Sequence, residues 1–362
     1  MTSRRPLRCV LVGCGQVAHE YLTTLRDQDA VDFVSCVDID TNRAMTFAAE
    51  HSVPAFGSPD EVLPGGGFDI AVILTPPSTH LDLAHQALDA EAHVYVEKPL
   101  GLDPIGTDAL LDHARAKGLL IGAAPDTVLA PPTLTALNAL ESGAIGTPIA
   151  GDAALLAPGP ETWNPAPWPC YAAGAGPLAD MGPYYLSMLV SLLGPIAYVE
   201  ATTTRTVPER TIRTGREAGR TFVTAEPTHV AAFLRTEGDA LISLTTSFDV
   251  AATTRPHLEI YGTDGTLVLP DPNFHDGPVR YRRRGSSAWQ EVDQVMTTTP
   301  QVGRGMGILD LADAIRRGAQ ECASGRRAHH VVEIIEAIRF AEKSGHPVEL
   351  ALLREERRAG LP

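Results

Sequence analysis

Lysine is scarce in this chain of 362 residues, since only Lys98, Lys117 and Lys343 are found among its 29 basic residues. Long apolar runs are absent as well, because none approaches the ~20 residues of a membrane-spanning helix. The five cysteines contain no C-x-x-C pair, and the twelve histidines contain neither H-x-H nor H-E-x-x-H. The sequence therefore predicts no membrane span, no disulfide framework and no metal centre. We expect free thiols in a cytoplasmic protein.

Positive charge is the minority sign. Acidic residues outnumber Lys plus Arg by 44 to 29, which gives a formal net charge of −15. Such a surface repels phosphate backbones and anionic lipids, which disfavours nucleic-acid and membrane partners. Hydrophobic residues make up 44% and charged residues 20%, as in folded globular chains. The length fits two domains, which we place at residues 1–124 and 125–362 because Pro125 opens a change in pattern after Ile121.

Short apolar runs alternate with amphipathic stretches in the first third of the chain. The pattern predicts strands at Leu7–Val12, Phe33–Val37, Asp69–Leu74, His93–Val96 and Leu119–Ile121, and helices at Gln16–Asp27, Asn42–Glu50, Thr79–Ala90 and Pro104–Lys117. Apolar strands joined by helices indicate a parallel sheet covered on both faces. We predict an α/β fold with an N-terminal, doubly wound Rossmann sheet. Later strand-like runs joined by short turns predict a C-terminal α+β domain with an open, mainly antiparallel sheet.

The first predicted strand runs into a G-x-G-x-x-A turn that starts at Gly13. Gly13 allows the tight turn, Gly15 lets a pyrophosphate approach the backbone, and the helix N-terminus stabilises its charge. Asp38 ends the second strand, where a carboxylate accepts hydrogen bonds from a ribose and repels a 2′-phosphate. NAD is therefore expected rather than NADP, although Arg43, close to Asp38 in sequence, leaves NADP open.

Two further segments follow neighbouring strands at their carboxyl ends, where ligands bind in open α/β sheets. The first is T-P-P-S-T-H from Thr75 to His80, which is also compatible with a plain strand-to-helix connection. The second is Glu97-Lys98-Pro99. A chain that uses arginine almost everywhere retains lysine here, and arginine cannot release its proton near neutral pH. We therefore assign Lys98 to catalysis rather than to a structural ion pair.

The three motifs together resemble the Gfo/Idh/MocA oxidoreductases. The resemblance continues at Gly174–Tyr184, which is similar to the G-G-G-x-L-x-D-x-G-x-H segment of that family, and at Tyr261–Leu267. Where most members have a catalytic histidine this chain has Tyr184, as in the branches of glucose–fructose oxidoreductase and dihydrodiol dehydrogenase. The family's acidic or amide residue three positions further on is Ser187 here. The resemblance implies hydride transfer with NAD, and packing of the second sheet into a homodimer or homotetramer.

A secondary alcohol must lose its hydroxyl proton as hydride leaves the carbon. We expect Lys98 to act as the base or proton relay, Tyr184 to bind the reacting oxygen, and Asp180 to orient the substrate or the lysine. Asp180 and Tyr184 are four residues apart, so one face of a single helix would carry both. A structural i,i+4 pair is the alternative. Metal ions take no part in this chemistry.

Further contacts are expected on both sides of the site. We expect Asp126 to bind a sugar hydroxyl or, equally well, to act as a helix N-cap or hinge residue. We expect Trp163 to stack on a sugar ring or to pin a loop. The full expected cofactor site consists of Gly13, Gly15, Gln16, Val17, Asp38, Ile39, Arg43, Thr75, Pro76, Pro77, His80, Glu97 and Lys98; the substrate site consists of Lys98, Asp126, Trp163, Asp180 and Tyr184.

The chain is thus expected to be an NAD(P)-dependent oxidoreductase acting on a hydroxyl or ketone of a pyranose, glycoside or cyclitol. Two alternatives remain. One is oxidation–elimination cleavage of a glycoside, in which the cofactor is recycled within each turnover. The other is a non-catalytic NAD-binding sensor, which would have no need of the proton-transfer groups.

Overall fold

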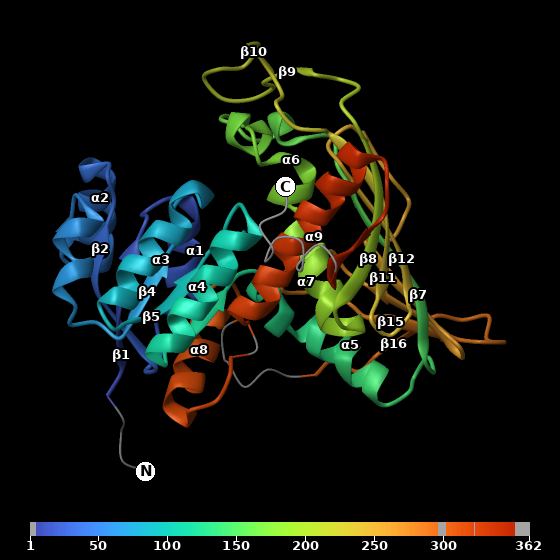
Figure 1. Ribbon diagram of the computed structural model, residues 1–362, viewed down its shortest axis with the longest axis horizontal. Helices are drawn as coiled ribbons and strands as arrows, with labels where there is room; N and C mark the ends of the chain where they lie inside the picture. Colours follow the sequence, from blue (N-terminus) through green and yellow to red (C-terminus); the bar gives the residue numbers. More distant parts are fainter. Residues whose placement is uncertain (1–4, 296–301, 322, 352–362) are drawn as a thin grey trace. The chain divides into compact units, whose positions relative to one another are not determined.

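The computed structural model describes residues 5–295, 302–321 and 323–351 (Figure 1). The chain divides into two compact units, one of residues 1–130 with 297–332 and one of residues 131–296 with 333–362. The sequence had placed everything after residue 124 in the second domain. The units differ from this because α8 (Met306–Arg317) packs in the first unit, where Asp126 accepts hydrogen bonds from the amides of Gly305 and Gly307. That the second domain binds the substrate and forms the oligomer stays a prediction.

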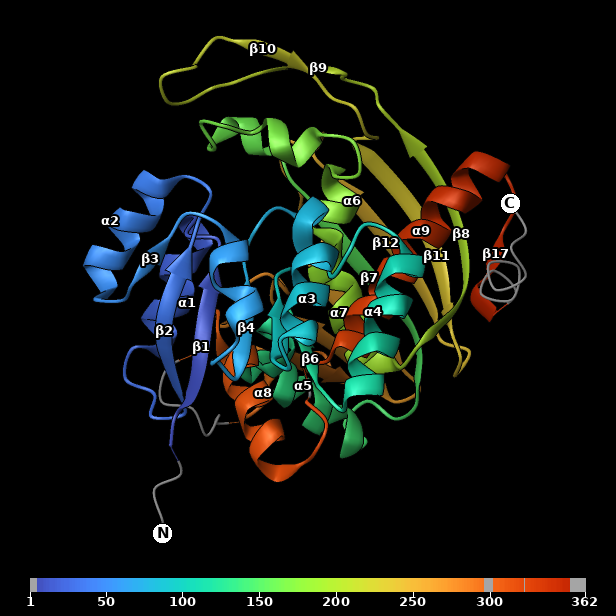
Figure 2. The ribbon, with the colours of Figure 1, turned by 60° about the vertical axis from the view of Figure 1, so that its left-hand side comes forward.

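The first unit contains a six-stranded parallel sheet in the order β3-β2-β1-β4-β5-β6; Figure 2 labels all of these strands except β5. This is the strand order of a doubly wound nucleotide-binding fold. The strands are β1 (Leu7–Val12), β2 (Val31–Val37), β3 (Ala55–Phe56), β4 (Ile70–Ile73), β5 (His93–Val96) and β6 (Ile121–Ala123). The helices are α1 (Gln16–Leu25), α2 (Thr41–His51), α3 (His80–Asp89), α4 (Pro104–Lys117) and α8.

Helices cover both faces of this sheet. Because successive strand residues point to opposite faces, the side chains on each face are buried against one of the two helix layers. On one face, Val10, Val12 and Val94 pack with apolar side chains of α3 and α4. On the other face, Cys9 and Leu11 pack with residues of α1, α2 and α8. Such two-sided burial is why the strands are continuous apolar runs in the sequence.

The second unit is built on a nine-stranded sheet in the order β16-β15-β14-β13-β7-β12-β11-β8-β17. Only β12 and β7 pair in parallel; the other neighbouring pairs are antiparallel. Its strands are β7 (Pro148–Leu156), β8 (Ile196–Thr204), β11 (His229–Thr236), β12 (Leu241–Ser247), β13 (Leu258–Gly262), β14 (Gly265–Leu269), β15 (Arg280–Arg283), β16 (Gln290–Glu291) and β17 (Val348–Glu349). The predicted fold class is confirmed for both units.

The remaining elements of the second unit are helices and one separate hairpin. The helices are α5 (Pro131–Glu141), α6 (Gly176–Asp180) and α7 (Gly182–Leu193), while α9 (Gly325–Ser344) begins in the first unit and ends in the second. The hairpin is formed by β9 (Glu209–Thr211) and β10 (Thr221–Val223). Among the described residues, no helix is both long and apolar enough to cross a membrane.

Candidate active site

The glycine turn after β1 has the geometry that a bound pyrophosphate needs. Gly13 has a φ of +101°, and a Cβ there would lie 2.8 Å from the carbonyl carbon of Leu74, so no larger residue fits. Gly15 precedes α1 without any side-chain cap, and no atom lies within 4 Å of the position its Cβ would take. The first amides of α1, at Gln16 and Val17, therefore have no side-chain cap from Gly15, and they lie at the positive end of the helix dipole. The residues present fit a dinucleotide.

Asp38 lies buried at the end of β2 with its carboxylate held in place. One oxygen accepts the amide of Cys14 at 3.0 Å and the other accepts the amide of Asp40 at 2.8 Å. Arg43, from the first turn of α2, approaches the same carboxylate to 3.3 Å. The neighbouring Ile39 is 86% exposed, which is unusual for an isoleucine. A flat apolar group bound over this side chain would account for its exposure. Asp38, Ile39 and Arg43 are the three residues of this segment that the sequence assigns to the cofactor, and their contact with it stays a prediction.

His80 joins the two loops at the carboxyl ends of β4 and β5. Its ring is fully buried, and its nitrogens lie 2.7 Å from the carbonyl oxygen of Thr75 and 2.8 Å from that of Pro99. Burial lowers the pKa of His80 in spite of these two carbonyl contacts. The buried imidazole between two backbone carbonyls holds the two loops together, and its expected contact with the cofactor stays a prediction. Pro76 and Pro77 lie on the first loop and take no part in the contacts of His80 with Thr75 and Pro99.

Glu97 anchors the loop that carries Lys98. Its buried carboxylate accepts a hydrogen bond from the hydroxyl of Tyr21 at 2.9 Å and another from the backbone amide of Lys98 at 2.8 Å. Burial, followed by the charge of Glu97, raises the pKa of Tyr21 well above its usual value, so this phenol stays a donor. Glu97 thus links α1 to the Lys98 loop, and the half-buried Lys98 side chain follows the carboxyl end of β5.

Asp126 makes the contacts that the helix-capping alternative predicts. Only 1% of its surface is exposed, and one carboxylate oxygen accepts the amides of Gly305 at 2.7 Å and Gly307 at 3.2 Å. These amides begin α8, so Asp126 caps that helix from a distant part of the chain. The contacts favour the helix-capping alternative over a sugar contact.

Asp180 and Tyr184 do not share a single helix, which corrects the expectation from their spacing. Asp180 is the last residue of α6, Met181 lies between the helices, and Tyr184 lies in the first turn of α7. The break follows from Pro183, which has no amide hydrogen to donate to the preceding turn. Tyr184 is 3% exposed, and Asp180 is half-buried.

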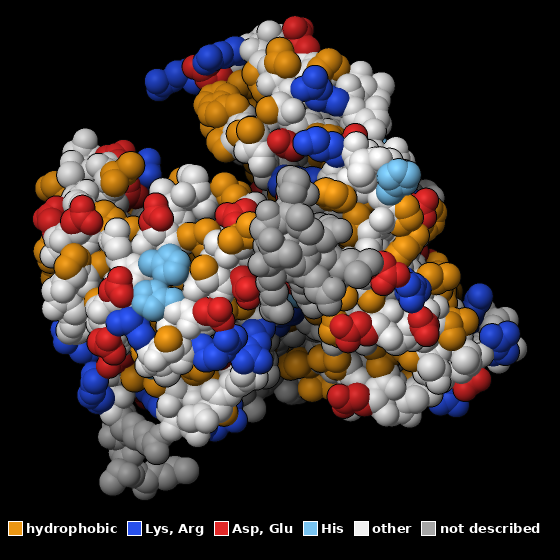
Figure 3. All heavy atoms as spheres, in the orientation of Figure 1, with side chains coloured by type: hydrophobic (Ala, Val, Ile, Leu, Met, Phe, Trp, Pro, Cys, Tyr) orange, Lys and Arg blue, Asp and Glu red, His pale blue; other side chains and the backbone are white. Residues whose placement is uncertain are grey.

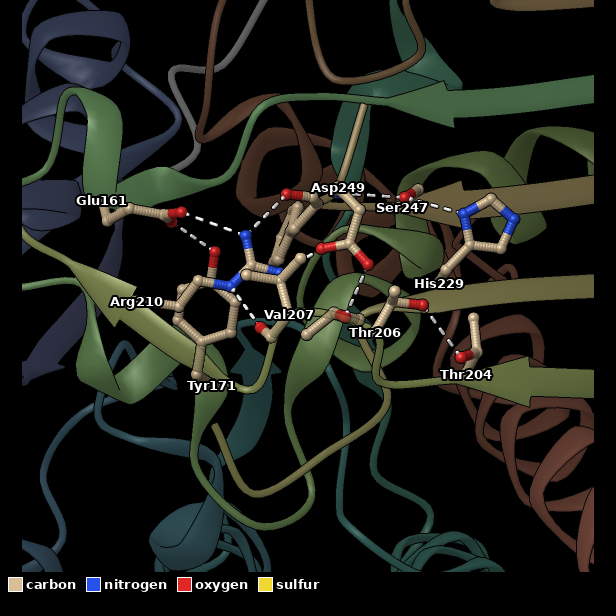
Figure 4. Close-up of polar contacts among 11 residues, drawn as sticks. Glu161, Tyr171, Thr204, Thr206, Val207, Arg210, His229, Ser247 and Asp249 are labelled. Carbon is tan, nitrogen blue, oxygen red and sulfur yellow. Dashed lines mark hydrogen bonds and ion pairs between the residues drawn. The ribbon is translucent and has the colours of Figure 1, made fainter. Parts of the chain in front are cut away.

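Trp163 lies on the loop between β7 and α6 and is 71% exposed. A tryptophan this exposed does not pin the loop, so the loop must be held by other residues. Figure 4 shows them: Arg210, from β9, lies between the carboxylates of Glu161 and Asp249. Tyr171 donates its hydroxyl to Glu161, and burial raises the pKa of this phenol. The network fixes both ends of the Trp163 loop to the β9–β10 hairpin.

Two family models match the chain. Residues 7–124 match the oxidoreductase family with an NAD-binding Rossmann fold, and residues 133–268 match the Gfo/Idh/MocA C-terminal domain. The chain belongs to the Gfo/Idh/MocA oxidoreductase family. The resemblance seen in its motifs is confirmed, and its first unit is an NAD-binding Rossmann domain.

Relatives within the Gfo/Idh/MocA family are named as sugar and cyclitol enzymes. The chain is 26% identical to the dTDP-3,4-didehydro-2,6-dideoxy-α-D-glucose 3-reductase of Streptomyces violaceoruber, over 91% of this chain and 97% of that enzyme. It is 28% identical to the scyllo-inositol 2-dehydrogenase (NAD⁺) of Bacillus subtilis, over 40% of this chain and 42% of that enzyme. For several curated relatives, the segment that matches this chain covers less than half of the relative's length.

Solved structures of the family share the fold. Levoglucosan dehydrogenase in complex with NADH and levoglucosan aligns with a TM-score of 0.82 at 19% identity, over 96% of this chain and all of that one. At this identity the likeness concerns the fold alone.

Sequence reasoning missed the residues that hold the site of this Gfo/Idh/MocA protein in shape. Arg210 is 49 residues from Glu161 and 39 from Asp249, so no local motif connects them. The bond from Tyr21 to Glu97 spans 76 residues. The one available signal was the low number of charged residues in the Pro/Gly-rich stretch around Glu161, where a lone acid suggests a buried partner.

Proposed function

We propose that the chain transfers hydride between NAD and a secondary hydroxyl or ketone of a pyranose, glycoside or cyclitol. The observation that supports this most is the pairing of an uncapped, glycine-bounded α1 N-terminus with a retained lysine, Lys98, on the same sheet edge. The substrates named for the two curated relatives, a sugar nucleotide and an inositol, support the substrate class.

The cofactor half of the site is proposed to work through charge and backbone. NAD, when bound, supplies the hydride acceptor. The free amides of α1 bind its pyrophosphate, and Asp38 accepts the ribose hydroxyls. The fixed negative charge of Asp38 favours NAD over NADP, whose 2′-phosphate it repels. Glu97 and His80 exclude water from behind the two loops and hold them in position.

The proton is proposed to move at the Nζ atom of Lys98. In oxidation of an alcohol, Nζ accepts the hydroxyl proton, and in reduction of a ketone it returns it. We propose that Tyr184 donates a hydrogen bond to the reacting oxygen and that Asp180 orients the substrate. Trp163, exposed and on a loop that is held rigidly, provides an apolar surface on which the face of a sugar ring stacks.

A panel of sugars, glycosides and cyclitols with NAD and NADP in parallel tests the proposal. We expect stoichiometric NADH formation with at least one polyol, and slower formation of NADPH. Cleavage of a glycoside without net NADH would indicate oxidation–elimination. Tight NAD binding without turnover on any compound would contradict the proposal and favour a sensor.

Nucleic-acid partners are not expected. On the face drawn in Figure 3, acidic side chains are interspersed with arginine and lysine side chains, without a continuous basic surface. Binding of a phosphate backbone requires a continuous basic surface.

A further inference from the structure

Three potential metal ligands meet on the outer side of the first unit, at the C-terminal end of α2. They are His19 of α1 and the consecutive residues Glu50 and His51 of α2. One ligand atom from each of the three lies within 4.8 Å of the others. The Nδ1 atom of His19 and a carboxylate oxygen of Glu50 are 3.5 Å apart, which is about the spacing of two ligands on one tetrahedral ion with bonds of about 2.0–2.2 Å.

The two imidazoles are held in position by a common aromatic neighbour. The ring of Phe47, which is 1% exposed, lies 5.0 Å from the ring of His19 and 4.4 Å from that of His51. The two imidazole centroids are 5.7 Å apart. Since Phe47 is fixed in the core, both rings are oriented before any ion binds, which reduces the entropy lost on coordination.

His51 carries a polar atom for which the described residues offer no partner. Its Nε2 atom is buried and accepts or donates no hydrogen bond among them. A buried nitrogen without a partner lowers stability, and a coordination bond or a metal-bound water would satisfy it.

The end of α2 favours a cation, and two exposed ligands leave the ion a route of entry. The last carbonyl groups of α2 place the negative end of its dipole at this point. The side chains of His19 and Glu50 are 42% and 53% exposed, so an ion and a completing water can reach the three ligands.

We propose that His19, Glu50 and His51 form a binding site for a divalent transition-metal ion such as Zn²⁺, which joins α1 to α2. Two imidazoles and one carboxylate select zinc and its neighbours in the first transition row, while magnesium and calcium prefer sites composed of oxygens. The sequence predicted no metal centre, because His19 is 31 residues from Glu50 and no motif spans that distance.

Calorimetric titration of the untagged, chelator-treated full chain with Zn²⁺ tests the site, with Mg²⁺ in parallel. We expect one equivalent of Zn²⁺ to bind and Mg²⁺ not to bind. His51→Gln and Glu50→Gln should each weaken zinc binding by roughly tenfold or more, because one of three ligands is lost. His346→Gln, at an exposed histidine of the second unit, is the matched control and should bind zinc like the wild type.

Thermal melting gives a second measurement that does not depend on activity. Zinc should raise the melting temperature of the wild type and of His346→Gln, since an ion that binds the native state stabilises it, but not that of His51→Gln. Glu50→Gln alters an exposed side chain, so its NAD binding should be normal and should show that the variant is folded. Absence of saturable zinc binding, or equal binding by the wild type and both ligand variants, would overturn the proposal.

Discussion

Asp38 is the residue on which the choice between the two nicotinamide cofactors is expected to depend. Its buried carboxylate is held by two backbone amides and faces Arg43. In Asp38→Ser the repulsion of a 2′-phosphate is gone and Arg43 is released to pair with it. We expect the ratio of kcat/KM for NAD over NADP to fall by about tenfold or more, a change of about 1.4 kcal/mol.

Asp40→Ser is the matched control, because Asp40 also lies beside Arg43 but is exposed and caps α2, and serine retains the cap. Its cofactor ratio should remain near that of the wild type. An unchanged ratio in Asp38→Ser, or a wild type that already prefers NADP, would contradict this account.

His93 is expected to make stability depend on pH. Its Nδ1 atom accepts the amide of Leu120 at 3.0 Å, so this nitrogen carries no proton in the folded state, and burial lowers the pKa of His93 from 6.5. The unfolded chain therefore takes up a proton as pH falls through about 6.5 while the folded chain does not. Stability is lost below that pH and is retained above it.

His93→Asn retains an acceptor close to the same place but cannot titrate. Urea unfolding from pH 8 to pH 5 should show a smaller loss of stability in the variant than in the wild type. The difference between them should be constant above pH 7. Parallel curves across the whole range would show that His93 does not carry this pH dependence.

Residues whose roles depend on neighbours in sequence were predictable, and those with distant partners were not. The φ of Gly13 and the end of β2 at Asp38 follow from a local motif. The helix-capping role of Asp126 needs Gly305, 179 residues away, and the sequence left two roles open. His80 sits in a motif, but its burial between two carbonyls depends on Pro99 in the next loop.

Among the elements, the β9–β10 hairpin and the Trp163 loop depend on one arginine. The side chain of Arg210 is 6% exposed and lies between Glu161, 7% exposed, and Asp249, 14% exposed. Arg210→Met leaves two buried carboxylates without their cation, so we expect the free energy of unfolding to fall by about 3 kcal/mol or more. Urea denaturation measures it.

Arg220→Met is the matched control on the same hairpin. Arg220 is 65% exposed and pairs with Glu217, so its loss should lower the free energy of unfolding by less than about 1 kcal/mol. A loss of the same small size in Arg210→Met would refute the role of the network. If the loop binds substrate as proposed, a folded Arg210→Lys should raise KM more than it lowers kcat.

Long apolar strands and capped helices were predictable as elements, and short or charged ones were not. In the first sheet, β1 and β4 consist mainly of valine, isoleucine and leucine. β15 is Arg-Tyr-Arg-Arg, whose charges suggest a loop, and it forms a strand because β14 supplies its hydrogen bonds. The break between α6 and α7 lies at Met181, two residues before Pro183, and this proline is a stronger signal than the spacing of Asp180 and Tyr184.

For the whole molecule, we expect an oligomer. One face of the second sheet carries Phe233 and Leu241 at 65% and 60% exposure, on the neighbouring strands β11 and β12. Apolar side chains in the middle of a sheet face indicate a surface that associates. Light scattering at micromolar concentration should give a mass that is a multiple of 38.5 kDa. Phe233→Glu should lower this mass, while Glu200→Gln, on the adjacent strand, should not. A wild-type mass near 38.5 kDa would contradict the expectation.

The central claim is that Lys98 moves a proton. Lys98→Arg retains the positive charge but cannot release a proton near neutral pH, and Lys98→Met retains the length alone. Both variants should bind NAD normally, because the pyrophosphate and ribose contacts are elsewhere. Loss of proton transfer typically lowers the rate by a factor of about 10² to 10⁴. The kcat of both Lys98 variants should therefore fall by that factor. The kcat of Tyr184→Phe should fall by a smaller factor if Tyr184 only positions the reacting oxygen.

The most direct measurement is therefore kcat of Lys98→Arg on the best substrate of the panel, with NAD affinity determined on the same preparation. The account predicts unchanged NAD affinity and a kcat lowered by about a hundredfold or more. A Lys98→Arg enzyme that retains most of the wild-type kcat would show that position 98 needs only a charge, and the proton-transfer group would have to be another residue.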